Sequence, residues 1–253
     1  QHFYSWWFNM RYKMIVSYDG TFFHGFQRQT NLISVQSVLE ETLTEILKTP
    51  VIIHGAGRTD AVVHAYGQVV HFDSTQLVPP KNLKKILNKK AYPHIYVSDI
   101  ELVDETFHSR KSAKGKEYHY IVDIGEYDPL KNNYVLYHHN RIDIDKIKQA
   151  MTYIVGTHDF KSLSRSKELK TTVRTIKSFD LDVTGTTLTF KIMGNGFMYN
   201  MVRIIIALML KVGEGKLKVE DVPRIIEAKD RTLVPWVAPA RGLYLMKVFY
   251  EEL

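Results

Sequence analysis

The sequence contains no cysteine. This absence excludes disulfide bonds, thiolate metal ligands and cysteine nucleophiles. It also suits a reducing compartment, where disulfides rarely form. We therefore expect a cytoplasmic protein.

Long hydrophobic runs are also missing. The most apolar stretch, Met201–Val212, includes Arg203 and Lys211 and is too short to cross a bilayer. We therefore expect no membrane association. Residues 1–9 lack the basic start and apolar stretch of a signal peptide. Because Met10 resembles a natural start, residues 1–9 are interpreted as an N-terminal extension and a candidate non-native segment.

Acidic residues are fewer than basic ones. Lysine and arginine number 34 against 27 aspartates and glutamates, which gives a net charge of +7. The 45% hydrophobic and 24% charged content is otherwise that of an ordinary globular protein. The basic excess favours a polyanionic partner such as a nucleic acid, although many basic proteins bind none.

Hydrophobic periodicity predicts the order β-α-β-β-α-β for the first half of the chain, which is a ferredoxin-like unit. Gly and Pro signals and the capping residue Ser34 delimit its elements. The strands are expected at residues 14–18, 51–54, 66–72 and 95–103, and the helices after Ser34 and after Pro79.

The second half repeats this pattern with insertions. We expect strands at residues 117–124, 173–183, 188–193 and 243–250. Helices are expected after Asp143, with Ile154 on the helix and Gly156 at its end, and at about 197–212 and 219–228. The prediction is an α+β fold with two ferredoxin-like, RRM-like halves whose sheets pack as one body around a central cleft. We assign residues 10–105 to an N-terminal domain with the catalytic loop and residues 106–253 to a C-terminal domain.

One loop combines two glycines with an arginine and an aspartate. In Gly55–Ala61, Arg58 and Asp60 are two residues apart between predicted strands. Loops held by a rigid sheet often carry catalytic groups. A surface turn with an ordinary Arg–Asp pair is the alternative.

Arg203 lies among residues that should be buried, in Met201–Leu208. A buried arginine needs a carboxylate partner, because an unpaired buried charge is costly. Asp60 is a candidate partner and would be kept ionised by the pairing. The alternatives are that Arg203 reaches the surface or pairs with Asp221 or Glu227.

Basic residues alternate with aromatic ones in Lys114–Tyr120, where Tyr118 and Tyr120 share a strand face. This combination suits RNA, since cations hold phosphates and rings stack on bases. Ordinary core tyrosines are the alternative. The 11 histidines do not follow a metal-ligand spacing, so we expect no metal site.

Seven blocks in a fixed order, from about Met10 to the end, resemble the tRNA pseudouridine synthase A family. They are Tyr18-Asp19-Gly20-Thr21 with Gly25-Phe26-Gln27; Gly57-Arg58-Thr59-Asp60 with Val63-His64-Ala65; Phe107-His108-Ser109-Arg110 with Tyr118; residues 156–160; Val173-Arg174-Thr175-Ile176; Gly194 through Arg203; and Ala238-Pro239-Ala240 with Gly242-Leu243.

The resemblance implies an isomerase that converts uridine to pseudouridine in the tRNA anticodon arm, at positions 38 to 40 of tRNA numbering. It implies a homodimer, with no cofactor or metal. Asp60 matches the catalytic aspartate, and Arg58 the arginine linked to base flipping. The expected substrate contacts are Arg58, Tyr118, Arg203, Leu243, His108 and Arg110; among these, Tyr118 would pack on the target uracil and Arg203 would pair with Asp60.

One position departs from the family pattern, which has glycine where this chain has Val62. Either the loop adopts an ordinary β conformation here, or Val62 displaces Asp60 and impairs catalysis. Two other functions compete with the isomerase: a tRNA-binding protein without activity, which Val62 would favour, and a small-molecule enzyme, which the basic charge disfavours.

Overall fold

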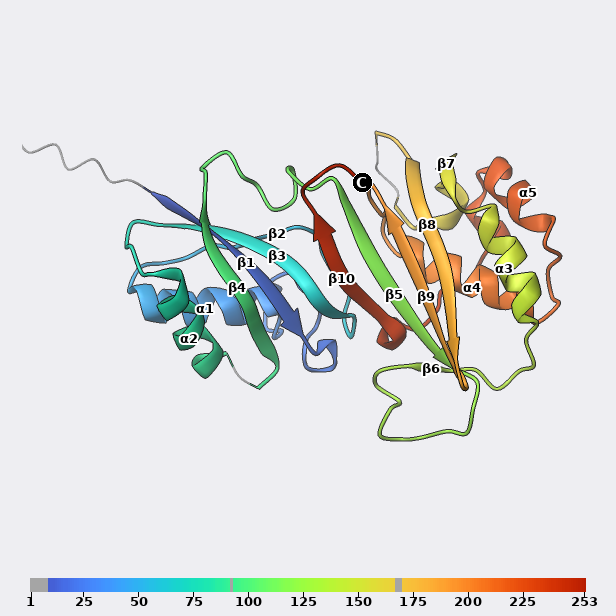
Figure 1. The fold of residues 1–253 in the computed structure, drawn as a ribbon, viewed down its shortest axis with the longest axis horizontal. Coiled ribbons are helices and arrows are strands. Elements are labelled where there is room, and N and C mark those ends of the chain that lie inside the picture. The colour runs from blue at the N-terminus through green and yellow to red at the C-terminus, as the bar shows by residue number, and fades with distance from the viewer. Residues whose placement is uncertain (1–8, 92, 167–169) are drawn as a thin grey trace, which may run out of the picture. The chain divides into compact units, whose positions relative to one another are not determined.

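The computed structural model describes residues 9–91, 93–166 and 170–253, and residues 1–8 of the predicted N-terminal extension lie outside these ranges. The chain divides along its sequence into two compact units, with the division between Ala113 and Lys114 (Figure 1). This junction lies eight residues after the predicted boundary at 105/106 (113 − 105). The assignment of two domains stays a prediction.

The N-terminal unit follows the predicted order of strands and helices. Its elements are β1 (Met10–Tyr18), the 3₁₀ turn η1 (Gly20–Phe22), α1 (Val35–Leu47), β2 (His54–Gly55), β3 (His64–Ser74), α2 (Pro80–Lys90) and β4 (Ile95–Val103). The antiparallel strands lie in the order β4-β1-β3-β2. This is the fourth-first-third-second arrangement of a ferredoxin-like sheet.

The C-terminal unit has the same arrangement with additions. Its elements are β5 (Gly115–Asp123), β6 (Leu136–Tyr137), α3 (Ile144–Thr152), β7 (Gly156–Asp159), η2 (Lys161–Leu163), β8 (Val173–Thr184), β9 (Thr187–Gly194), α4 (Met201–Gly213), α5 (Asp221–Ala228), η3 (Arg231–Leu233), η4 (Ala240–Gly242) and β10 (Leu243–Phe249). The strand order is β10-β5-β9-β8-β7, and β6 pairs in parallel with β5. The predicted α+β class and the β8–β9 hairpin are confirmed.

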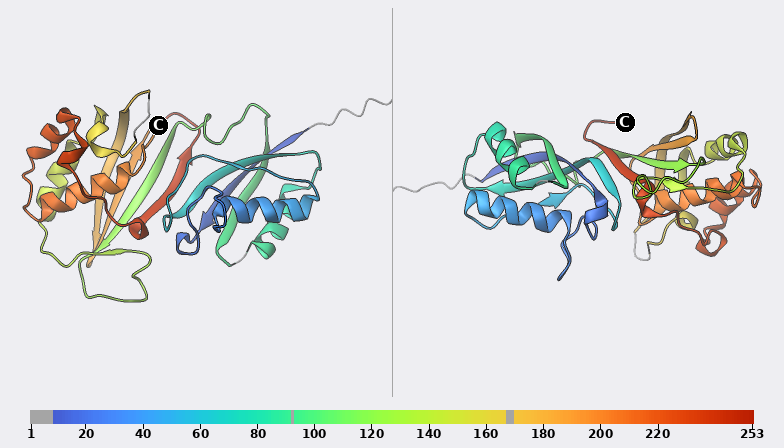
Figure 2. Two further views of the ribbon diagram at one scale, coloured as in Figure 1. Left: turned by 180° about the vertical axis from the view of Figure 1, so that it is seen from behind. Right: turned by 90° about the horizontal axis from the view of Figure 1, so that it is seen from below.

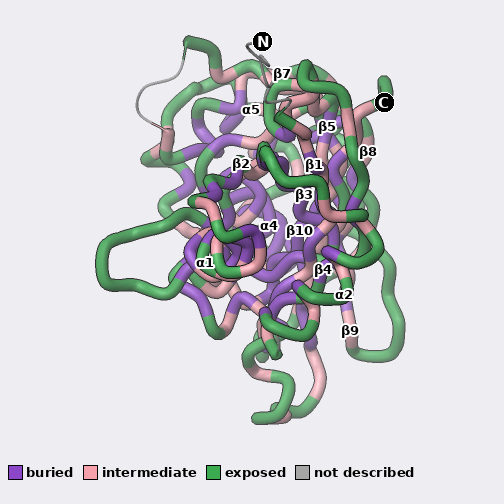
Figure 3. The backbone as a smooth tube through the Cα atoms, turned by 90° about the vertical axis from the view of Figure 1, so that its left-hand side faces the viewer, coloured by how far each residue is buried: buried purple, intermediate pink, exposed green. Residues whose placement is uncertain are grey.

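Each unit has a core between its strands and helices. In β1, alternate residues from Tyr12 to Tyr18 are buried, and α1 buries one face through Val35, Leu39, Leu43 and Leu47. Figure 2 shows α1 and α2 beside the strands of the N-terminal unit, and α3, α4 and α5 beside those of the C-terminal unit. In Figure 3 most of α4 is buried and drawn in purple, whereas most of β8 is exposed or intermediate and drawn in green or pink.

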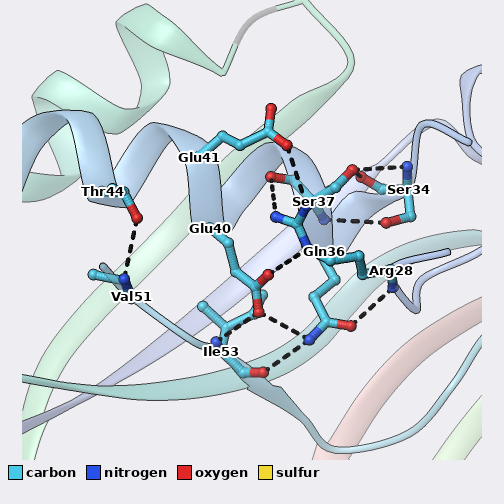
Figure 4. A network of polar contacts seen from close by, with 9 residues as sticks. All are labelled: Arg28, Ser34, Gln36, Ser37, Glu40, Glu41, Thr44, Val51 and Ile53. Carbon is cyan, nitrogen blue, oxygen red and sulfur yellow. Dashed lines mark hydrogen bonds and ion pairs between the residues drawn. The ribbon is translucent and has the colours of Figure 1, made fainter. Parts of the chain in front are cut away.

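The predicted strand at 51–54 is wrong for residues 51–53, because their backbone groups bond to α1 instead of a neighbouring strand. The Val51 amide donates to Thr44 Oγ1 at 3.1 Å, and the Ile53 amide donates to Glu40 Oε1 at 3.1 Å (Figure 4). Only His54 and Gly55 pair with β3. Side chains of α1 thus replace ladder bonds that a sequence pattern alone would assign to a sheet.

Two predicted helix boundaries also shift. The helix expected from about residue 197 begins at Met201, because Asn200 has a left-handed backbone with a φ of 59°. The helix after Asp143 ends at Thr152, so Ile154 and Gly156 lie beyond it. Gly156 has a φ of +112° and begins β7. Ile154 is nevertheless buried, as its apolar side chain requires.

Candidate active site

The Arg58-Thr59-Asp60 segment lies in the N-terminal unit, in the loop between β2 and β3. Its three side chains differ in burial: Arg58 is exposed, Thr59 is buried and Asp60 is partly exposed. The buried threonine therefore anchors the loop, while the two charged residues on either side of it keep access to solvent. This is the arrangement that a reactive carboxylate on a rigid loop needs.

Thr59 is anchored by a buried hydrogen-bond network. Its Oγ1 lies 2.8 Å from the Tyr18 hydroxyl, and the Gln68 side-chain amide donates to Tyr18 Oη at 3.4 Å and to the Gly57 carbonyl at 2.9 Å. The Phe26 amide donates to the Thr59 carbonyl at 3.0 Å. Burial raises the pKa of Tyr18 to about 12, so its hydroxyl keeps its proton at neutral pH.

Two glycines of the N-terminal motif let the backbone pass close to this loop. A Cβ on Gly25, whose φ is +88°, would stand 2.8 Å from the Thr59 carbonyl oxygen. A Cβ on Gly20 would stand 2.1 Å from the Val63 carbonyl oxygen. His64 Nδ1 also accepts the Gly20 amide at 3.0 Å. The motif from Tyr18 to Phe26 therefore forms a support for the loop.

Sequence reasoning did not identify Tyr18, Gln68 and His64 as residues that hold the candidate site. Their side chains are buried and polar, and such residues need hydrogen-bond partners. The signal in the sequence was a glutamine and two histidines inside the apolar strand of residues 64–74. Their partners are set by the tertiary structure, which brings the loop and the N-terminal motif beside this strand.

The turn after Asp60 settles one of the two expectations for Val62. The Val63 amide donates to the Asp60 carbonyl at 3.1 Å, and Val62 has a φ of 70°. The expectation of an ordinary β conformation is therefore wrong. Valine occupies the third position of a turn that calls for positive φ and normally takes glycine there. The backbone strain of a β-branched residue in this region is about 1–3 kcal/mol.

Val62→Gly is expected to stabilise the N-terminal unit by about 1 kcal/mol, after the greater freedom of glycine in the unfolded chain is subtracted. Thermal unfolding measures this gain, with Val63→Ala as a buried control that should lose stability. Turnover should change less than about threefold, because the hydrogen bond of the turn is already formed with valine. A large rate increase would instead support impairment by Val62.

The segment with His108 and Arg110 packs onto the N-terminal sheet through Ser109. Ser109 Oγ donates to the His54 carbonyl at 2.6 Å, and its amide donates to His71 Nδ1 at 3.1 Å. His54 is the first residue of β2 and directly precedes the loop with Asp60. His108 is partly exposed and Arg110 is exposed, so their side chains remain accessible.

Lowering the pH is expected to weaken the contact between Ser109 and His71, because His71 then becomes protonated. Burial, followed by the nearby charges of His108 and His54, lowers the pKa of His71 to about 4. In the unfolded chain histidine titrates near pH 6.5, so between pH 6.5 and 4 the unfolded state binds the proton more readily. Neutral His71 therefore contributes to the stability of the folded state above pH 6.5, and this contribution is lost as the pH falls toward 4.

We expect wild-type protein to lose about 2 kcal/mol more stability than His71→Asn between pH 7 and 4.5. The asparagine side-chain oxygen can accept the Ser109 amide but does not titrate. Denaturant unfolding at a series of pH values measures the difference. Parallel pH profiles of the two proteins would contradict this role of His71.

In the C-terminal unit, Tyr118 and Leu243 lie on adjacent strands. Tyr118 of β5 pairs with Leu245 of β10, and Leu243 pairs with Tyr120. Residues two apart on a strand share a face, so Tyr118 and Leu243 lie on the same face of this sheet. Both are almost buried, and the Tyr118 ring meets Phe197 edge-on, with 5.2 Å between centroids.

Arg203 lies near Tyr120, the residue of β5 that pairs with Leu243. Its Nε donates to the Ala238 carbonyl at 2.7 Å, and its charge acts on the Tyr120 hydroxyl, whose pKa is raised by burial against the opposing effect of Arg203. The Tyr120 hydroxyl donates to the Pro239 carbonyl at 2.7 Å. The structure therefore places Tyr118 and Leu243 on one sheet face, with the charge of Arg203 acting on Tyr120 of the same strand as Tyr118. The pairing of Arg203 with Asp60 stays a prediction.

Within the described ranges, no group of three histidine, aspartate or glutamate side chains is placed to hold a metal ion. In the same part of the chain, no helix has both the length and the apolar character needed to cross a membrane.

Comparison with known proteins yields close relatives. The chain matches a family model described as tRNA pseudouridine synthase over residues 14–110 and 150–251. A tRNA pseudouridine synthase A of Levilactobacillus brevis is 42% identical over 248 residues, which cover 95% of this chain and 94% of that protein. A protein of the same name from Geobacillus sp. is 43% identical over 245 residues, which cover 96% and 99% of the two chains.

Proposed function

Because the chain belongs to the tRNA pseudouridine synthase family, we propose that it isomerises uridine to pseudouridine at positions 38 to 40 of the tRNA anticodon arm, with Asp60 as the catalytic carboxylate. The observation that carries the proposal is the anchored loop: Thr59 is fixed by Tyr18, while Asp60 next to it keeps access to solvent. A carboxylate held in this way is positioned before the substrate arrives.

The reaction breaks the N1–C1′ glycosidic bond, rotates the uracil and joins C5 to C1′. The hydrogen on C5 leaves as a proton, and N1 takes up a proton, so the product is an isomer of uridine. No electrons are gained or lost overall. Asp60 can act as a nucleophile that forms a covalent intermediate or as a general base, and both roles require an ionised carboxylate. The support of its loop in the N-terminal unit fits either role.

The other site residues would bind the substrate. The target base must leave its stack, which costs a few kcal/mol. We assign Arg58 to base flipping, because its side chain is exposed beside Asp60. Tyr118 and Leu243 would provide an apolar surface for the uracil, and Arg203 would keep Asp60 ionised. His108 and Arg110, on the segment anchored by Ser109, would contact the RNA backbone.

We also propose that the enzyme is a cytoplasmic homodimer that needs neither a metal nor a cofactor. The absence of cysteine and the basic net charge of +7 are consistent with a cytoplasmic RNA-binding protein. Sedimentation at a series of concentrations tests the dimer, and activity in the presence of a chelator tests independence from metals.

The proposed activity is tested with tRNA that carries tritium at uridine C5. The label must be released when C5 bonds to C1′, so wild-type protein should release tritium in proportion to the pseudouridine formed. tRNA binding should weaken steeply with salt, since phosphate contacts release counterions. Salt-sensitive binding without tritium release would contradict the enzyme and favour a tRNA-binding protein.

A further inference from the structure

A stacked pair of rings, the exposed Phe22 and the partly exposed His94, lies near the candidate catalytic loop. Phe22 and His94 stack with 3.5 Å between ring centroids and 12° between ring planes. Phe22 is 49% exposed, whereas its neighbour Phe23 is 6% exposed and contacts Tyr18 in the core. Phe23 therefore provides the core packing at this point of the chain, whereas the Phe22 ring is outside the core and accessible to a partner.

Backbone hydrogen bonds fix the two chain segments that carry Phe22 and His94. Phe22 ends η1, which follows β1, and His94 precedes β4. These strands are neighbours, with Tyr18 paired to Ile95, and the Asp19 amide donates to the His94 carbonyl at 3.1 Å. The Asp19 side chain also caps η1 by accepting the Thr21 amide at 3.0 Å. The two rings are therefore held in place before any partner binds.

The ring pair is connected to the turn that follows Asp60. η1 begins at Gly20, whose close approach to Val63 and hydrogen bond to His64 join η1 to that turn. Phe22 is two residues further along the same 3₁₀ turn. The rings and the loop with Asp60 thus belong to one continuous part of the N-terminal unit.

We propose that Phe22 and His94 form a stacking platform for an unpaired nucleobase of the RNA substrate, next to the uridine that Asp60 acts on. The proposal rests on the proposed function. A nucleobase presents a flat π face that matches an exposed ring, and this kind of stacking tolerates any base. The platform would hold a neighbouring base while the target uridine leaves its stack.

The test compares Phe22→Ala, Phe22→Leu and Phe22→Trp in tRNA binding and in single-turnover tritium release at saturating tRNA. We expect Phe22→Ala to raise Kd about 5- to 150-fold, the range for the loss of one base–aromatic stack, with the saturating rate changed less than about threefold. Phe22→Leu should bind nearly as weakly, because it keeps apolar area but loses the ring. Phe22→Trp should bind like wild type.

Tyr153→Ala is the matched control, since Tyr153 is an aromatic residue with 40% exposure at the end of α3, and it should leave Kd unchanged. Phe22→Trp gives a direct signal as well: its added fluorescence should be quenched by tRNA. Unchanged binding by Phe22→Ala, wild-type binding by Phe22→Leu, or unquenched Phe22→Trp would each overturn the platform. Missing tritium release by wild-type protein would overturn the proposed function instead, and the binding and quenching results would still decide the platform.

Discussion

Asp60→Asn is expected to lower tritium release by about 10³-fold or more, because the amide can neither attack as a carboxylate nor accept the proton. The turn after Asp60 is closed by backbone atoms of Asp60 and Val63, so this hydrogen bond does not depend on the side chain that is changed. tRNA affinity should change less than about threefold. Single-turnover tritium release at saturating tRNA measures the loss.

Two further variants sharpen this test. Asp60→Glu keeps the charge but moves the carboxylate by about one bond length, and such a displacement alone can cost about 10²-fold in rate. Asp99→Asn is the matched control, because Asp99 is exposed on β4 in the same unit and should leave the rate unchanged. Substantial activity in Asp60→Asn would remove Asp60 from the reaction.

Glu40→Ala is expected to destabilise the N-terminal unit by about 2–3 kcal/mol, because the variant loses a buried carboxylate that accepts several hydrogen bonds. Glu40 is 7% exposed. One carboxylate oxygen accepts the Arg28 Nε hydrogen at 2.8 Å, and the other accepts the Gln36 side-chain amide at 2.9 Å and the Ile53 amide (Figure 4). Removing the carboxylate leaves the Ile53 amide buried without its acceptor.

Glu41→Ala is the matched control for this prediction. Glu41 is the next residue of α1 and bonds the same arginine at 3.3 Å, but its side chain is 70% exposed. Exposed ion pairs contribute little, so its loss should stay within about 0.5 kcal/mol. Thermal unfolding should show a Tm that is about 4 to 12 °C lower for Glu40→Ala and nearly unchanged for Glu41→Ala. Equal shifts for the two variants would show that burial does not decide the effect.

The network of Glu40 also connects stability to the candidate site. Through Ile53 it fixes the segment that leads into β2 and the loop with Asp60, and through Arg28 it fixes the chain that follows Phe26. Phe26 itself bonds the Thr59 carbonyl. The segment before β2 and the segment after Phe26, which both lead to the loop with Thr59, are therefore held by the same buried carboxylate of α1.

Local patterns in the sequence determined the fold class and most elements. The apolar spacing behind Ser34 predicts α1, and Ser34 indeed caps it through a reciprocal bond with Ser37. Alternation predicts β8 and β9 as a hairpin. These features depend on residues close in sequence, where period and capping are sufficient. The family motifs predict Asp60 as the catalytic residue, and this role stays a prediction.

Only the tertiary structure decided which distant groups meet. No local pattern indicates that the Ile53 amide bonds to Glu40 instead of a neighbouring strand. The same holds for the bonds of Tyr18 and Gln68 that fix the loop at Thr59. It holds as well for the contact of Ser109 with His71. The local sequence also does not show that Val62 has a φ of 70° despite its branched side chain. These outcomes depend on contacts between segments far apart in the chain, which form only when the whole unit packs and which override local preference.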